Sequence, residues 1–186
     1  MKVGIAALFI GISSSFYSQY FIGEISGTMN ELDFESQFTW RFEEDTTYYE
    51  LDFILEHEEH KVVLTFDGDT TALIEMFEEG KLVESRPCTP SELSSIVTIV
   101  EEEKEEGPEL IGYSTETYLI RTDEKEIEAD LGNISVNWHG AEKFFAVDIP
   151  FALASQEKGK FPLKIVSTDL KGNVQYSLVV TDINKK

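Results

Sequence analysis

The chain has few of the residues from which many enzyme sites are built. Its 186 residues include one cysteine, Cys88, and three histidines. A single cysteine cannot form an internal disulfide, so we expect packing rather than cross-links to stabilise the fold. Cys88 is expected to be a buried or idle thiol. The chain also lacks the P-loop, Gly-x-Ser-x-Gly and His-Glu-x-x-His patterns. We therefore expect no enzyme, no catalytic residue, no metal and no cofactor.

Basic residues are scarce as well. Lys and Arg total 15 against 36 Asp and Glu, which gives a formal net charge of −21. Such a charge repels nucleic acid and anionic lipid surfaces, so we expect no nucleic-acid partner. It favours cations or basic partners, or it simply keeps a β-rich protein soluble. With so many acids, pairs of carboxylates do not indicate a glycosidase.

Long apolar runs are absent except at the start of the chain. Lys2 precedes an apolar stretch at residues 3–12, and small polar residues follow at 13–18. This order is typical of a signal peptide, and we expect cleavage just before Gln19. The run is shorter than the about 20 residues of a membrane-spanning helix, so it is not predicted to span a bilayer. The alternative to a signal peptide is an unusually apolar first core strand. The sequence thus predicts export to the periplasm or the exterior, with no transmembrane span in the mature chain. Residues 19–186 are predicted to form a single β-rich domain.

Alternation of apolar and polar residues predicts strands through the first half of the chain. Residues 21–29 alternate, with Gly23 and Gly27 on the apolar face, where they allow a backbone or a large ring to approach closely. Even positions are apolar over 34–42 and odd positions over 47–55, which predicts a hairpin. Similar runs predict strands at 62–66 and 72–76, with turns at 56–60 and 67–69.

A different pattern follows at residues 89–108. Thr89, Pro90 and Glu92 form a capping box, and Gly107 and Pro108 form a stop signal. Between them, apolar residues recur with helical spacing at Leu93, Ile96, Val97 and Val100. The pattern predicts a helix over 90–106. A strand is the alternative, because 96–100 is rich in β-branched residues and glutamates at a helix C-terminus oppose its dipole.

The second half returns to strands. The stretch 110–121 predicts a strand that continues through, or turns briefly at, Ser114 and Thr115. Further strands are expected at 127–131, 134–138, 161–165 and 174–180, with an irregular segment packed on the sheet at 144–151. The predicted fold class is mainly β (α+β). It is a curved antiparallel sheet or part-open barrel, with one main helix packed on or in its concave face.

Three short motifs could suggest metal or thiol chemistry. His57 and His60 flank two glutamates, but a hairpin turn lacks the helical register that brings paired histidines together. Asp67 and Asp69 lack the rest of a calcium loop. Cys88 has no histidine near it in the sequence. Each motif is therefore predicted to be structural.

The stretch 111–120, Ile-Gly-Tyr-Ser-Thr-Glu-Thr-Tyr-Leu-Ile, resembles a family of exported bacterial proteins defined as a domain of unknown function. The Gly159 and Phe161-Pro162-Leu163-Lys164-Ile165 ending, followed by a Gly172 turn, is similar too. The family resembles the lipoprotein-localisation carriers in fold, which implies a sheet wrapped round a helix and an apolar cavity. Thr115 stands where the family often has cysteine, so a thiol-dependent role is not carried over.

These features together predict a non-enzymatic exported protein that binds an apolar ligand, such as a lipid or acyl chain, in the concave face of the sheet. The predicted lining consists of Phe38, Trp40, Phe42, Tyr49, Phe53, Leu93, Val97 and Val100. The alternative is an acidic envelope or extracellular interaction protein with a filled core and no ligand.

Overall fold

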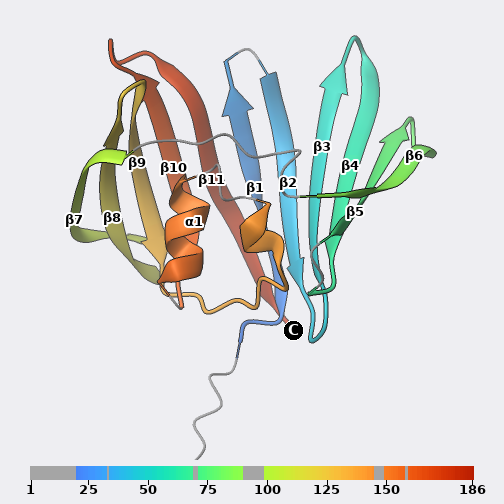
Figure 1. Ribbon diagram of the computed structural model, residues 1–186, viewed down its shortest axis with the longest axis horizontal. Coiled ribbons are helices and arrows are strands. Elements are labelled where there is room, and N and C mark those ends of the chain that lie inside the picture. The colour runs from blue at the N-terminus through green and yellow to red at the C-terminus, as the bar shows by residue number, and fades with distance from the viewer. Residues whose placement is uncertain (1–19, 33, 69–70, 90–98, 145–148, 158) are drawn as a thin grey trace, which may run out of the picture.

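A computed structural model describes residues 20–186 except 33, 69–70, 90–98, 145–148 and 158 (Figure 1). In these residues eleven antiparallel strands form one unclosed sheet in the order β6-β5-β4-β3-β2-β1-β11-β10-β9-β8-β7. The prediction of a mainly β, antiparallel fold is confirmed. The strands are β1 (Gly23–Glu31), β2 (Phe34–Phe42), β3 (Thr47–Leu55), β4 (Glu58–Phe66), β5 (Ala72–Glu78), β6 (Lys81–Cys88), β7 (Ile99–Leu110), β8 (Tyr113–Thr122), β9 (Lys125–Gly132), β10 (Phe161–Asp169) and β11 (Val174–Lys185).

The two halves of the chain meet in the middle of the sheet. Strands β1 to β6 follow one another outward on one side, and β11 to β7 do so on the other. The last strand pairs with the first, with Met29 opposite Leu178 and Glu31 opposite Tyr176. The seam between β1 and β11 therefore depends on contacts between residues far apart in the sequence.

Alternation sets the register of the first strands, as predicted. Ile25 lies opposite Trp40, Trp40 opposite Tyr49, and Tyr49 opposite Leu64. Because side chains alternate between the two faces, this row of apolar residues lies on one face of the sheet. We call it the inner face, because the helix lies on it.

Helix α1 (Ile149–Gln156) and the 3₁₀ turn η2 (Ala141–Lys143) lie in front of this face in Figure 1. The α1 segment contacts β10 and β9. Pro150 stands in its first turn, where a missing backbone N–H is tolerated. The segment at 144–151, expected to be irregular, thus ends in a helix, and its residues 145–148 lie outside the described part. The strand expected at 134–138 is wrong, because this segment forms no strand and leads into η2.

The main helix predicted over 90–106 is wrong in its described part. Residues from Ile99 onward form the edge strand β7, and 90–98 lie outside the described residues. Strand β7 pairs with β8 along most of its length. Without β7, the backbone N–H and C=O groups on that side of β8 would lack partners in the sheet. The glutamates of β7 stay in water on both faces, and charges on an edge strand discourage pairing with other chains. A helix would instead place them against its own dipole.

The stretch from 110 to 121 is a strand, and it continues through Ser114 and Thr115. The turn falls earlier, at Ile111 (φ 51°) and Gly112 (φ 79°). Two successive residues with positive φ form the tight hairpin turn that matches the twist of paired strands. The described residues contain no helix long and apolar enough to cross a membrane.

Candidate functional site

A cluster of aromatic rings fills part of the inner face. Trp40 of β2 lies at its centre and is fully buried. Its ring centroid lies 5.5 Å from Trp138, 5.8 Å from Phe151 and 6.3 Å from Phe161. Trp138 also stacks on Phe161, with centroids 5.6 Å apart. The rings of the sheet are therefore covered by rings from the 133–140 segment and from α1.

A hydrogen-bond network fixes the segment that carries Trp138. The Thr47 hydroxyl of β3 donates to the Asn137 carbonyl at 2.8 Å, and Thr47 Oγ1 lies 3.1 Å from His139 Nδ1. The other ring nitrogen, His139 Nε2, lies 3.0 Å from the Glu44 carbonyl oxygen. Thr47 is fully buried, so these bonds replace lost hydration and attach the segment to β3.

The structure separates the residues predicted to line a ligand site. Phe38, Trp40, Phe42 and Tyr49 are brought together on the inner face and are buried. Phe53 shares that face and is half-buried. Val100 is exposed on the edge strand β7 and does not join them. Leu93 and Val97 lie outside the described residues.

A second apolar area continues from the cluster across β3, β4 and β5. Leu51 lies opposite Val62, and Val62 opposite Met76. All three are half-buried, as are Phe53 and Ile74 on the same face. We call these five residues the inner-face row. Alternation in the sequence predicts that they share one face, but of the five only Phe53 is in the predicted ligand lining.

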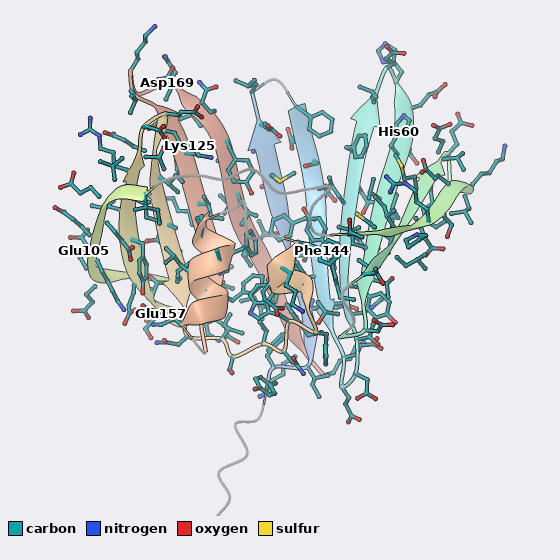
Figure 2. All side chains as sticks on the ribbon, viewed as in Figure 1. His60, Glu105, Lys125, Phe144, Glu157 and Asp169 are labelled. Atoms are coloured by element: carbon teal, nitrogen blue, oxygen red, sulfur yellow. The ribbon has the colours of Figure 1, made fainter. Side chains whose placement is uncertain are left out.

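The end of this row borders a hollow. Phe53 stacks on His60 with ring centroids 5.3 Å apart and interplanar angle 10°, and Phe34 meets Phe53 edge-on at 5.1 Å. A hollow of about 580 Å³ is bordered by Ser36, Phe53 and His60 and by outward-facing neighbours on the same strands. Figure 2 shows His60 in the upper part of this side of the sheet, away from α1.

An ionic network joins the end of α1 to the neighbouring strands β8 and β7. Glu116 Oε2 of β8 lies 2.7 Å from Lys104 Nζ and 3.0 Å from Lys160 Nζ. Lys104 also reaches Glu157, which Figure 2 places at the base of α1. The two ammonium groups, Lys104 first, lower the pKa of Glu116, and the Glu116 carboxylate raises the pKa of Lys104. Burial, aided by Glu157, raises the pKa of Tyr118 to about 12. These charges are paired and hold elements together.

The three motifs considered for metal or thiol chemistry have structural positions. His57 (φ 77°) belongs to the β3–β4 turn, while the His60 ring stacks on Phe53. Asp67 follows β4, and Asp69 lies outside the described residues. Cys88 is buried at the end of β6, as expected. Among the residues that the structure describes, no group of three or more His, Cys, Asp or Glu is placed to hold a metal ion.

Three rings that shape the inner face were not assigned to it from the sequence: Trp138, Phe151 and Phe161. Pro150 before Phe151 was the available sign of a helix start. Trp138 gave no such sign, since its partners are distant in sequence. No protein-family model matches the chain, and no curated protein matches it.

Proposed function

We propose that the protein is a non-enzymatic exported protein that binds an apolar chain, such as the acyl chain of a lipid, on the inner-face row. The observation that carries the proposal is that the apolar row of β3–β5 remains half-buried, whereas the neighbouring aromatic cluster is buried by the chain's own rings. Ligand sites are typically apolar and concave, with few polar groups.

The neighbourhood of the row supports this choice. His60 stacks on Phe53 at the end of the row. A carboxylate or headgroup there would meet a polar imidazole beside an apolar surface. The resemblance to lipoprotein-localisation carriers also implies an apolar ligand site, although the main helix that it implies is not found among the described residues.

The lining proposed from the sequence is narrowed accordingly. Trp40 and Phe42 lie against Trp138, and Trp40 also lies against Phe151, so these two rings are covered. Phe38 and Tyr49 are buried beside them, and Phe53 stays in the ligand surface. Leu93 and Val97 lie outside the described residues and are left out of the proposed surface. Val100, exposed on β7, is left out of the ligand surface.

The test compares two valines that neighbour each other on β4. Val62 faces inward opposite Leu51, and Val63 faces outward opposite Glu50; both are half-buried. We expect Val62→Gln to weaken uptake of a fluorescent fatty acid roughly tenfold, since placing an amide against an apolar ligand costs about 1–2 kcal/mol. Val63→Gln should bind like the wild type. Absence of uptake together with no bound lipid in native mass spectrometry, or equal loss in both variants, would overturn the proposal.

The second candidate is an acidic interaction protein whose inner face is filled. It is favoured by the burial of Trp40 beneath Trp138 and Phe151 and by the run of glutamates exposed on β7. Its partner would be basic, and binding would fall steeply with modest salt. A pull-down with polylysine beads at low and high salt tests it, and retention that does not change with salt excludes it.

A further inference from the structure

One end of the sheet carries exposed aliphatic side chains on three neighbouring hairpin tips. Ile54 and Leu55 end β3, Leu32 follows β1, and Leu170 and Val174 flank the β10–β11 turn. These hairpins are consecutive in the sheet, because β4, β3, β2, β1, β11 and β10 are neighbours in that order. We call these five residues the apolar rim. The hairpin tips stand at the upper edge of the sheet in Figure 1.

Leu32 is the most unusual residue of the rim. It is 71% exposed and adopts a φ of 52°. A left-handed backbone disfavours leucine, and water disfavours its side chain, so a turn of purely structural purpose would suit asparagine or glycine better. The Leu32 amide donates to the Gln175 carbonyl at 3.0 Å. This bond places Leu32 beside the start of β11, where Val174 is also exposed.

The opposite end of the sheet differs. The β2–β3 turn there consists of Glu43, Glu44, Asp45 and Thr46, and Asp67 follows β4. Ile111 is the exposed aliphatic residue of the β7–β8 turn at that end. Exposed aliphatic residues also occur elsewhere, such as Leu73 near the start of β5, but among the described residues they gather on neighbouring hairpin tips at the rim.

The geometry and charge of the rim point to one kind of partner. Tips of neighbouring hairpins lie two strands apart, or about 10 Å, so their side chains would enter a fluid interface separately rather than fill one pocket. Glu31, Glu56, Glu58 and Asp169 surround the tips, and Lys171 is the basic residue among them. Hydrogen bonds from Asn173 lower the pKa of Asp169, which keeps it charged. Acids at this density repel anionic lipid.

We infer that the apolar rim docks the protein on an uncharged, zwitterionic lipid surface. The aliphatic tips insert among the headgroups while the acids stay in water. Docking does not require the ligand site. Phe53 of the inner-face row lies next to Ile54 of the rim on β3, so docking could place the ligand site near the lipid. Only this link between docking and acyl-chain loading rests on the proposed function.

The test measures flotation of the full chain with phosphatidylcholine vesicles. Every variant shares the same N-terminus, so differences between variants report the rim. We expect Leu32→Asn to weaken vesicle binding roughly tenfold, as expected for one lost leucine insertion. The fold should be kept, because asparagine accepts a left-handed backbone. The matched control is Ile111→Asn, which makes a similar change at φ 51° on the opposite end and should bind like the wild type.

Additional variants and vesicle compositions distinguish membrane docking from ligand binding. Ile54→Asn combined with Leu32→Asn should abolish flotation, and added phosphatidylglycerol should weaken wild-type binding at low salt. Val62→Gln should float like the wild type whether or not fatty-acid uptake is lost. Failure of the wild type to float with phosphatidylcholine, equal loss in Leu32→Asn and Ile111→Asn, or stronger binding to anionic vesicles would overturn the inference.

Discussion

Phe38 lies against Gly27 on the neighbouring strand, so that a Cβ at Gly27 would come within 2.8 Å of Phe38 Cζ. The two residues are paired in the β1–β2 register. The Val179 carbonyl oxygen of β11 crowds the same position, and backbone cannot move aside as a flexible side chain can. The seam between the two halves of the sheet thus depends on a residue without a side chain.

Gly27→Ala should therefore lower the free energy of unfolding by about 1–3 kcal/mol, as expected for overpacking a buried contact. Urea denaturation followed by tryptophan fluorescence measures the change. Thr28→Ala, one residue further along β1 and on the outer face, is the control and should shift the midpoint little. Equal midpoints for Gly27→Ala and the wild type would show that β1 and β11 can separate at no cost.

Trp138 is the ring by which an irregular segment covers the sheet. It is buried, stacks on Phe161 and meets Trp40 edge-on. Trp138→Ala should destabilise the protein by about 3–5 kcal/mol, the usual range for removing a large buried ring. Trp138→Phe keeps a ring and should lose much less.

The measurement is straightforward because the chain contains two tryptophans. In either Trp138 variant, Trp40 is the remaining fluorophore, and it lies within the same cluster. A Trp138→Ala variant whose stability equals that of Trp138→Phe would mean that the 133–140 segment contributes little to the core.

Much of the sheet could be predicted from the sequence, because its signals are local. Alternation over β2 and β3 identified Phe38, Trp40 and Tyr49 as inward-facing, and the burial of these residues agrees. The glycines of β1 were expected to admit a close neighbour, and the Phe38 ring at Gly27 is that neighbour. Where one face is apolar and the other polar, a strand has a single acceptable register.

The helix prediction failed where local and long-range preferences disagree. Glutamate and the cap signals favour a helix locally. The described part of that region, from Ile99, instead forms strand β7 and gives hydrogen-bond partners to the backbone of β8. As an edge strand it buries little on either face, so it carries no alternation. Conversely, the helix α1 was not predicted. It is short, and its mostly apolar sequence has no polar face that would mark a helical period.

The covering of the inner face could not be foreseen for a related reason. Trp138 reaches Trp40 across nearly one hundred positions of the chain, and the hydroxyl that attaches its segment comes from Thr47. Such contacts depend on the finished topology. The sequence shows which rings face inward on a strand, but not which other segment will cover them.

Thr47 allows this attachment to be tested directly. Thr47→Val keeps the shape of the side chain but removes the bonds to the Asn137 carbonyl and His139 Nδ1. A buried acceptor left without a partner costs about 1–3 kcal/mol, and unfolding experiments should show a loss of that size. The amide of His139 should also exchange faster with deuterium, since its segment is less firmly held.

Thr65→Val on β4 is the matched control, because Thr65 lies opposite Tyr48 and faces outward. A β-branched apolar residue in a strand should be tolerated there. If both valine variants unfold at the wild-type midpoint, the bonds of Thr47 are replaced by water and the 133–140 segment is held by its rings alone.

The ion pairs of Glu116 predict how stability depends on pH. Lys104 and Lys160 lower its pKa in the folded protein. A lowered pKa means that the folded state favours the charged carboxylate, so the contribution is complete above the ordinary carboxyl pKa, about 4.3. This contribution to stability disappears as the pH falls through the lower pKa that Glu116 has in the folded protein. Glu116→Gln should therefore be less stable than the wild type at neutral pH, and the difference should close in acid.

Urea denaturation across this acid range measures the difference between the two proteins. The effect should be modest, because Glu116 is partly exposed and water screens its charge. Glu126→Gln removes the longer and more exposed pair with Arg121 and serves as the control. Its difference in stability from the wild type should change less with pH. Since Lys104 also reaches Glu157 below α1, Glu116→Gln should speed deuterium exchange at the end of that helix. A stability difference that widens in acid would mean that Glu116 is held by something other than its two lysines.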